Sequence, residues 1–492
     1  MPINPIDPSE FRRGVPGDEE QEQHRRRVRQ QVRELAAASA PSAEEILNRI
    51  REVQDLVEGE GGRAMPFDTY RPEGRDEGEA ATLVARDQLV VRLENPRGVR
   101  PAGQDEGAAA GQERGYGGPG RQEIIEILRD MDYDIEERIG ARDSRNEVFR
   151  YSGRREPAEL ASDIRMLRDR GVTANMHVVV PLGHIIKGGD LPAKTPYTVE
   201  RRSGGTYPPG PRVRVAVIDT GVGPVRTADQ FLTDVEREPD NAELLDVAPV
   251  NQRLDWFSGH GTFTAGIVQQ VAPDVEVVVY RFISNNGLGT EKDVAEELIR
   301  AADDAAAEST EDAPIRLVIN ASVGAPPAVD GTPPIALRDA VELIQERYPE
   351  VLIVASSGND GTTLPMYPAA FKQVVAVGAL TDDMQGADFS NRGHWVDCSA
   401  VGVGLVSTFV EGTLPPEPQF DGRYDVTTFP PDPFAVWTGT SFSAPQICGA
   451  VAQLCRQNPD LSPRAALNTL LAGQPELPGF GRVVRILPGT PL

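Results

Sequence analysis

The amino-acid sequence predicts an α/β protein whose main domain is a parallel sheet with helices on both faces, preceded by a smaller α+β domain. Three observations support this. From residue 212 onward, short apolar runs alternate with helical segments, which is typical of buried parallel strands joined by helices. Residues 82–181 hold shorter strand-like and helix-like segments. The chain of 492 residues is also too long for one ordinary hydrophobic core, so several domains are expected.

The N-terminal region, residues 1–62, is charged and helix-prone. Apolar residues such as Ile46, Leu47 and Ile50 recur in it at helical spacing. A flexible arm and a small helical hairpin both fit this pattern, and the region contains no motif that carries chemistry. Residues 63–81 are rich in Gly and Glu and are predicted to be a linker.

Residues 82–181 are predicted to form the small α+β domain. Its segments follow the order β-α-β-β-α-β, which is the split βαβ or ferredoxin-like arrangement. The predicted strands and helices are residues 87–94, 124–131, 135–139, 148–151, 160–171 and 176–180. Residues 182–211 are rich in Gly and Pro and are predicted to connect this domain to the next one.

The main α/β domain is predicted to span residues 212–476. Ligands of open parallel sheets bind beyond the carboxyl ends of the strands, so a site is expected there. Residues 477–492 are predicted to be a short tail, in which RVVRIL is a candidate extra strand. The continuous apolar runs of the domain are RVRVAVID (212–219), VEVVVYRF (275–282), IRLVIN (315–320), VLIVASSG (351–358) and VVAVGAL (374–380).

Composition limits the classes of partner. A net charge of −25 at pH 7 repels nucleic-acid phosphates and anionic membrane surfaces, so neither is expected as a partner. No apolar run approaches the roughly 20 residues that cross a bilayer. The polar start of the chain lacks the apolar stretch of a secretory signal, which predicts a cytoplasmic protein. The cysteines Cys398, Cys448 and Cys455 are too few for a disulfide framework and lack zinc-ligand spacing.

Four polar residues stand at the ends of predicted strands or the starts of predicted helices. Asp219 directly follows the strand predicted at 213–218, and Asn359 follows another buried strand. His260 lies between two glycines before an apolar helix, and Ser441 precedes a second apolar helix. A carboxylate, an imidazole and a hydroxyl can form an activated nucleophile, and an amide can donate to an oxyanion. Each residue alone also fits an ordinary turn or helix cap.

The four motifs together are more specific than each one alone. In the order DTG, GHGT, SSGN and GTSFSAP, they resemble the subtilisin family of serine peptidases, over about residues 212–475. The resemblance implies a serine endopeptidase whose catalytic triad is Asp219, His260 and Ser441. It also implies an oxyanion hole that contains the side chain of Asn359.

The resemblance further implies a substrate site. Ser322, Val323 and Gly324 correspond to a strand that lines the substrate, and Ser357 and Gly358 directly precede Asn359. An extended peptide can pair with such a strand, so the expected partner is a protein or peptide substrate in extended form.

Four positions depart from the family's usual pattern, one of them Val401, which stands where Pro is frequent. Met366 stands where Gly often lies near the specificity pocket, and it would narrow that pocket. Phe442 stands where Met is common, and Gln446 stands where His is common. Both of the latter changes are interpreted as packing swaps that leave the triad intact.

The small domain lies directly before the peptidase region, which resembles the position of an inhibitory prodomain in the family. By this resemblance it is an intramolecular partner that keeps a zymogen latent, with the connector in the active site. A permanent docking domain without an inhibitory role is the alternative. The chemistry requires no cofactor. Structural calcium supports many family members and is compatible with the acidic chain, but the sequence locates no site for it.

Three other functions share parts of this pattern. A peptide-binding scaffold would keep the fold but would not need the intact triad. An esterase or lipase of α/β-hydrolase type would need G-x-S-x-G at the nucleophile, whereas the run here is GTSFS. A sedolisin-like enzyme would carry Glu in place of His260. His394 is a rival base, but it lacks glycines on both sides and is expected at the surface.

Overall fold

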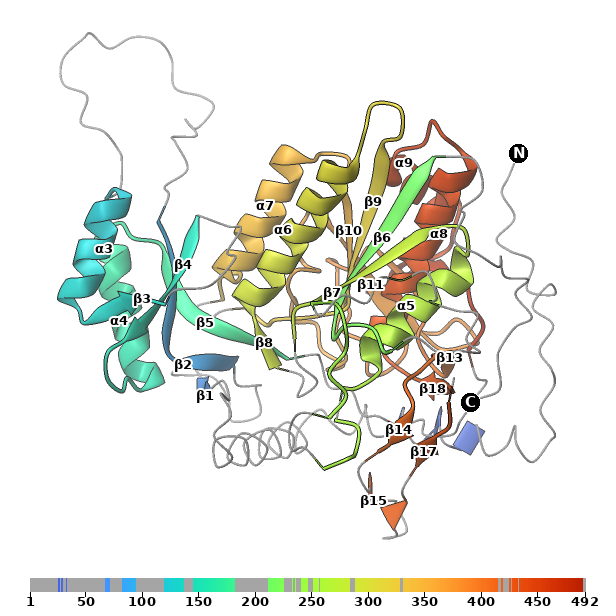
Figure 1. Cartoon of the computed structure of the whole chain (residues 1–492), viewed down its shortest axis with the longest axis horizontal. Coiled ribbons are helices and arrows are strands. Elements are labelled where there is room, and N and C mark those ends of the chain that lie inside the picture. Colours follow the sequence, from blue (N-terminus) through green and yellow to red (C-terminus); the bar gives the residue numbers. More distant parts are fainter. Residues whose placement is uncertain are drawn as a thin grey trace.

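The chain folds into a smaller and a larger domain that lie side by side in the computed structural model (Figure 1). The structure describes residues 25–26, 28–29, 32, 67–70, 82–93, 119–136, 145–181, 211–224, 232, 235, 240–246, 251–255, 257–283, 288–327, 331–414, 417–418, 424–425, 427–431 and 433–489.

The smaller domain has the predicted order of elements. Its antiparallel sheet runs β3-β4-β2-β5, and buried apolar residues of α3 and α4 pack against the sheet. The predicted strand at 87–94 overlaps the second half of the longer β2, which ends at Arg92. The strand predicted at 135–139 is shifted, since β3 ends at Ile135 and shares only that residue with the prediction. The elements are β2 (Thr82–Arg92), α3 (Arg121–Asp130), β3 (Tyr133–Ile135), β4 (Asn146–Tyr151), α4 (Pro157–Asp169) and β5 (Ala174–Pro181).

The linker predicted at residues 63–81 is wrong for its middle part. Phe67–Tyr70 form strand β1, which pairs antiparallel with β2. Phe67 is buried beside Val179 of β5, and this contact gives the strand its place in the sheet. A strand of four residues between polar segments is too short to show a hydrophobic period. The remainder of the predicted linker lies outside the described residues.

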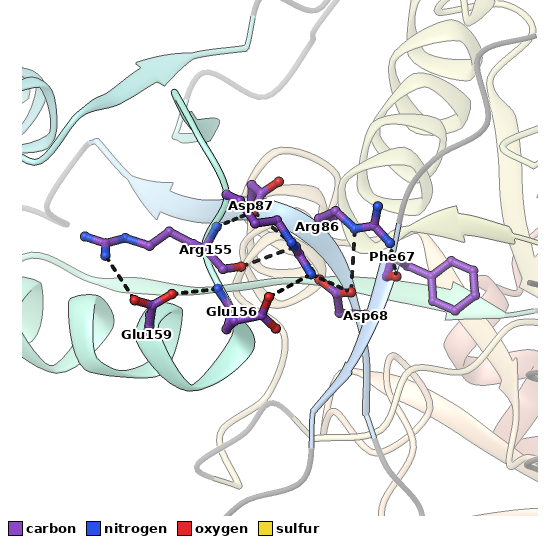
Figure 2. Close-up of polar contacts among 8 residues, drawn as sticks. Phe67, Asp68, Arg86, Asp87, Arg155, Glu156 and Glu159 are labelled. Atoms are coloured by element: carbon purple, nitrogen blue, oxygen red, sulfur yellow. Dashed lines mark hydrogen bonds and ion pairs between the residues drawn. The ribbon is translucent and has the colours of Figure 1, made fainter. Parts of the chain in front are cut away.

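Ion pairs fasten β1 to the start of α4, as Figure 2 shows. The guanidinium of Arg154 binds both carboxylate oxygens of Asp68, at 2.8 and 3.1 Å. Asp87 has a positive φ of 60° and accepts the backbone N–H of Arg155 at 2.7 Å. Glu156 and Glu159 then form a capping box at the start of α4.

The larger domain is built on a sheet of eight strands in the order β19-β20-β12-β11-β10-β9-β6-β7. Neighbouring strands are parallel except β19 and β20. All five apolar strands predicted from sequence are present, because strands buried on both faces leave continuous apolar runs. The strands are β6 (Arg212–Asp219), β7 (Glu276–Arg281), β9 (Ile315–Ala321), β10 (Leu352–Ser356), β11 (Val374–Leu380), β12 (Cys398–Val401), β19 (Glu476–Leu477) and β20 (Gly481–Val484).

Helices cover both faces of this sheet (Figure 1). On one face lie α6 (Glu291–Glu308) and α7 (Ile335–Arg347), and on the other α5 (His260–Val271), α8 (Ala444–Gln457) and α9 (Pro463–Leu471). Alternate residues of β6 contribute to two different hydrophobic clusters, as the pleat of a strand requires. Shorter strands complete the domain: β8 (Leu288–Thr290), β13 (Leu405–Thr408), β14 (Gly412–Thr413), β15 (Glu417–Pro418), β16 (Tyr424–Asp425), β17 (Thr428–Phe429) and β18 (Phe434–Trp437).

The domain boundary predicted at residue 476 is too early. The candidate extra strand is present as β20, which pairs parallel with β12 inside the main sheet. Beyond it, the backbone N–H of Leu487 donates to Gln446 Oε1 at 3.0 Å. Gln446 Nε2 donates to the carbonyls of Val401 and Phe442 at 2.6 and 2.8 Å. Gln446 therefore ties the C-terminal segment to α8, which is the packing role expected for this position.

The two domains meet through a continuous sheet edge and through polar contacts. Strand β5 of the smaller domain pairs antiparallel with β8 of the larger one. Arg92 binds Asp339 on α7 through two guanidinium nitrogens. The ammonium of Lys292, fully buried on α6, donates to the carbonyl of Asn146 at 3.0 Å.

The N-terminal region also contacts the larger domain. Val28 is fully buried in a cluster with Phe389, Val403 and Val436, and Val32 packs against the same cluster. Within the parts of the chain that the structure describes, no helix combines the length and apolar character needed to span a bilayer.

Candidate active site

Asp219 and His260 form a buried hydrogen-bonded pair. Asp219 is the last residue of strand β6, which lies beside the edge strand β7 in the sheet, and His260 is the first residue of α5. His260 Nδ1 and Asp219 Oδ1 are 2.6 Å apart, and neither side chain has access to solvent. The same carboxylate oxygen accepts the backbone N–H of Thr220 at 2.7 Å. The structure thus brings together two residues that are 41 positions apart in the sequence.

Glycines permit the close approach of β6 and α5. Gly261 lies so near the backbone carbonyl of Gly221 that a Cβ at position 261 would overlap it. Gly221 has a φ of +106° and Gly259, the N-cap of α5, has a φ of +88°, and both values favour glycine. Gly261 therefore serves the contact between the two elements, whereas a Cβ on Gly259 would overlap the ring of Phe409.

The imidazole of His260 is enclosed by aromatic side chains. Its ring centroid is 5.3 Å from that of Phe442 and 5.6 Å from that of Trp437. Its second nitrogen, Nε2, is buried and makes no hydrogen bond to any described residue. Because Nδ1 faces a carboxylate, the neutral ring is expected to carry its proton there. Nε2 is then the atom available to accept a proton.

Ser441 lies in a one-turn 3₁₀ helix, Thr440–Phe442, directly before α8. The ring contact between His260 and the next residue, Phe442, brings this turn beside the imidazole. Ser322 Oγ donates to the carbonyl of Ser441 at 2.9 Å, and Asn320 Nδ2 donates to Ser322 Oγ at 2.9 Å. The turn is therefore anchored to β9. The hydroxyl of Ser441 is not hydrogen-bonded to His260 Nε2, so the hydrogen bonds of this structure join Asp219 to His260 but do not continue to Ser441.

Asn359 has a fixed orientation at the end of β10. Its Oδ1 accepts the backbone N–H and the hydroxyl of Thr440, both at 2.8 Å. The amide nitrogen Nδ2 lies 3.6 Å from the place that a Cβ on Gly439 would take. The Asn359 amide is thus held next to the turn that carries Ser441, with its oxygen already used.

Three of the residues predicted to bind substrate are buried inside the domain. Ser322 and Ser357 are buried and donate to the backbone carbonyls of Ser441 and Asn391, at 2.9 and 3.0 Å. Their side chains hold neighbouring segments together. Val323 is buried with 1% of its surface exposed.

Gly324 and Gly358 lie on either side of Met366. A Cβ added to Gly324 would be 3.1 Å from Met366 Cε, and one added to Gly358 would be 3.3 Å from Met366 Cγ. The thioether side chain thus fills the space between the two segments predicted to line the substrate.

Two residues near the pair were missed by sequence reasoning. Trp437 packs against His260 from β18, and Glu243 lies under Thr220 and Gly259. Neither belongs to one of the four motifs. Trp437 comes two residues before GTSFSAP, and its position next to this motif was the one signal for it. Glu243 stands in a segment without periodicity, so its role depends on the tertiary structure alone.

The remaining candidate groups lie apart from this centre. His394 is exposed, as expected. All three cysteines are free and buried, and burial raises the pKa of the Cys455 thiol to about 11. Over the described ranges, no group of three or more His, Cys, Asp or Glu side chains is arranged to hold a metal ion.

Fold and site together define an α/β protein with an aspartate–histidine pair beside a helix-start serine. The model of the subtilase family matches residues 210–477, more than half of the chain. The protein therefore belongs to the subtilase family.

Individual relatives resemble this part of the chain. The thermophilic serine proteinase of Bacillus sp. (strain AK1) is 30% identical over 261 residues, which cover 49% of this chain and 52% of that protein. Subtilisin BL of Lederbergia lenta is 28% identical over 267 residues, or 51% of this chain and 80% of that protein. The chain thus matches only about half the length of the first relative.

A solved structure extends the likeness beyond the larger domain. The crystal structure of fervidolysin from Fervidobacterium pennivorans, a keratinolytic enzyme related to subtilisin, aligns with 86% of this chain and 63% of that one. The TM-score is 0.53 and the sequence identity is 18%, so the agreement concerns the fold.

Proposed function

We propose that this protein is a serine endopeptidase in which Asp219, His260 and Ser441 act as a triad. The observation that carries the proposal is the buried Asp219–His260 hydrogen bond of 2.6 Å, which leaves Nε2 without a partner beside the Ser441 turn. Hydrogen bonds to a nucleophile are often long before substrate binds, so the open Ser441–His260 gap is compatible with this role. Family membership supports the same activity.

The chemistry proceeds by two acyl transfers. Ser441 Oγ attacks the peptide carbonyl carbon while Nε2 of His260 takes the hydroxyl proton. Asp219 stabilises the imidazolium, and the Asn359 amide with the Ser441 backbone N–H binds the oxyanion. When the C–N bond breaks, His260 returns the proton to the leaving amine. Water, deprotonated by His260, then hydrolyses the acyl-enzyme ester and regenerates the Ser441 hydroxyl.

A fluorophosphonate probe tests this assignment. The active protein is expected to gain one covalent label on Ser441, and the S441A and H260A variants are expected to gain none. Labelling of the wild-type protein at another residue, or no labelling after activation, would favour a peptide-binding scaffold with the same fold.

The substrate is proposed to be an extended protein segment that binds along the segments of Gly324 and Gly358. Met366 separates these glycines and supports a shallow pocket that excludes large side chains. Digestion of a peptide library by the wild type and by M366G is expected to differ at the residue before the cleaved bond. Identical profiles would count against the pocket.

We further propose that the smaller domain makes the enzyme latent. The β5–β8 pairing and the Arg92–Asp339 ion pair support a stable docked state. Strand β5 ends at Pro181, so the connector leaves from the shared sheet edge. Incubation of the pure chain is expected to produce a new N-terminus within residues 182–211, together with a rise in activity. Full activity of an uncut chain would instead indicate a permanent docking domain.

A further inference from the structure

A buried carboxylate lies directly behind the Asp219–His260 pair. The segment of Glu243 runs beside the residues that follow Asp219. The Val222 N–H donates to the Asn241 carbonyl, and the Glu243 N–H donates to the Val222 carbonyl, both at 2.9 Å. These two bonds bring the Glu243 side chain under the end of β6, where it is 93% buried because only 7% of the residue is exposed.

Three donors converge on this carboxylate. The Gly259 N–H and the Thr220 hydroxyl both donate to Glu243 Oε1 at 2.7 Å, and the Thr262 hydroxyl donates to Oε2 at 3.1 Å. Thr220 is adjacent to Asp219 in the chain, while Gly259, the N-cap of α5, and Thr262 in its first turn lie on either side of His260. Glu243 is therefore bonded to the neighbours of both members of the pair.

The two hydroxyls have their direction fixed by a second set of contacts. Thr220 Oγ1 accepts the Gly261 N–H at 3.0 Å, and Thr262 Oγ1 accepts the Gly223 N–H at 2.8 Å. Since a backbone N–H can only donate, each hydroxyl has its own proton free to point at Glu243. Two hydrogen bonds thus link the residues that follow β6 to α5, and the Glu243 carboxylate accepts from both of the hydroxyls that take part in them.

This carboxylate also supplies what the start of α5 lacks. The N-cap residue is Gly259, which has no side chain to accept the first N–H groups of the helix. An anion at a helix N-terminus is favoured by the helix dipole. Thr220 Oγ1 accepts the Gly261 N–H in the first turn, while Glu243, from a separate loop, accepts the N–H of the N-cap residue and, when ionised, supplies the negative charge.

We propose that Glu243 is a positioning residue for the catalytic pair, which holds Asp219 and His260 in register through its hydrogen bonds and, in its ionised form, adds a second negative charge near the imidazole. This rests on the proposed function and deepens it. Burial is the largest cause that raises the pKa of Glu243 to about 7, against its three donors, and the charge of Asp219 raises it further. The ionisable groups that face Glu243 are thus Asp219 on β6 and, through it, His260 on α5.

Three variants test the proposal. E243Q keeps an acceptor oxygen for Gly259 and Thr220 but removes the charge, whereas E243A removes the charge and the hydrogen bonds. D246N is the matched control: it removes a charge from the same loop, where Asp246 accepts the backbone N–H groups of Asn251 and Gln252 at 3.0 and 2.6 Å. In the activated enzyme, kcat/KM is measured against pH. In the full chain carrying S441A, the His260 ring is titrated by NMR and assigned with H260Q.

The expected results separate charge from geometry. Glu243 is neutral below its raised pKa of about 7 and ionised above it. Loss of the ionised form destabilises the imidazolium, so in E243Q the acid limb and the His260 titration move to lower pH, by up to about 1 unit because the charge is only partial near pH 7. E243A is expected to lose about 10- to 100-fold in kcat/KM because the pair is misaligned. D246N is expected to change neither quantity.

Other outcomes would overturn the proposal. An unchanged His260 titration in E243Q would show that the charge of Glu243 does not act on His260. Full activity of E243A would show that its hydrogen bonds do not position the pair. If E243A does not fold, the kcat/KM of T262V, which removes the hydroxyl that donates to Glu243 Oε2, decides on the positioning part, while E243Q and the titration decide on the charge. If the wild type has no peptidase activity, the proposed function fails, while the titration still reports whether Glu243 acts on His260.

Discussion

The amide of Asn359 can be oriented without ambiguity. Amide oxygen and nitrogen are usually assigned from their hydrogen-bond partners. Here the partner is the backbone N–H of Thr440, which can only donate, so the facing atom must be oxygen. The nitrogen is then left as the donor beside the Ser441 turn, which is the atom that an oxyanion requires.

Asn359→Asp should therefore isolate the donor. It retains the oxygen that accepts from Thr440 but replaces Nδ2 with a second acceptor. We expect kcat to fall by about 100- to 1000-fold or more with little change in KM, a range known from a subtilisin and hence from this protein's own family. The control T440V removes one hydroxyl bond to Asn359 but keeps the backbone bond, and it should stay within about tenfold of wild type. A fully active N359D would remove Asn359 from the oxyanion hole.

Phe442 gives a second test at the level of one residue. Its ring is fully buried against His260, Phe263 and Trp437. F442A is expected to lower the free energy of unfolding by about 3–5 kcal/mol through the cavity it leaves. F442M, of similar volume, should cost less than about 1.5 kcal/mol and keep most activity. Denaturant titration of both variants in an S441A background measures the difference; equal stabilities would mean that this packing matters little.

At the scale of elements, the contact between the end of β6 and the start of α5 determines the geometry of the pair. Gly261→Ala would push a Cβ into the Gly221 carbonyl and separate the two elements. We expect the rate of fluorophosphonate labelling to fall at least about tenfold, since small misplacements of catalytic groups are costly. G120A is the control, because Gly120 has an ordinary φ of −74° and open space around it. Equal labelling rates would show that the contact is adaptable.

The same elements explain what the sequence could predict. Strand β6 was predicted at 213–218, within one residue of its observed bounds 212–219, because a strand buried on both faces leaves a continuous apolar run. Asp219, His260, Asn359 and Ser441 follow from motifs at strand and helix ends. Strand β1 is too short to show a hydrophobic period. Glu243 is 23 residues from its partner Thr220, in a loop whose sequence has no hydrophobic periodicity. Contacts of that kind exist only after folding, so no local signal encodes them.

At the scale of the whole molecule, a buried glutamate lies between the two domains. Glu291 on α6 accepts the backbone N–H of Val178 in the smaller domain at 3.2 Å and that of Ala336 at 2.9 Å. Burial raises its pKa from 4.5 to about 7, against these two bonds and the charges of Lys292 and Arg338. The docked state therefore binds a proton that the unfolded chain has already released.

This proton makes stability depend on pH with a defined sign. Below pH 4.5 Glu291 is protonated in both states, and between pH 4.5 and about 7 the folded state holds the extra proton. The unfolding free energy must therefore fall as pH rises through this window, by at most about 3 kcal/mol. Because Val178 belongs to the smaller domain, separation of the domains should follow the same trend.

Glu291→Gln should remove this part of the pH dependence, because the amide is neutral at every pH. In an S441A background, which prevents autolysis, we expect the loss of unfolding free energy from pH 5 to pH 8 to be smaller in E291Q than in the parent chain. Glu243 contributes with the same sign, but it is present in both chains and cancels. E346Q is the matched control, since Glu346 is an exposed partner of Arg145 at the same interface. If E291Q and the parent lose equal stability between the two pH values, Glu291 is ionised in the docked state and the interface carries a buried charge instead of a buried proton.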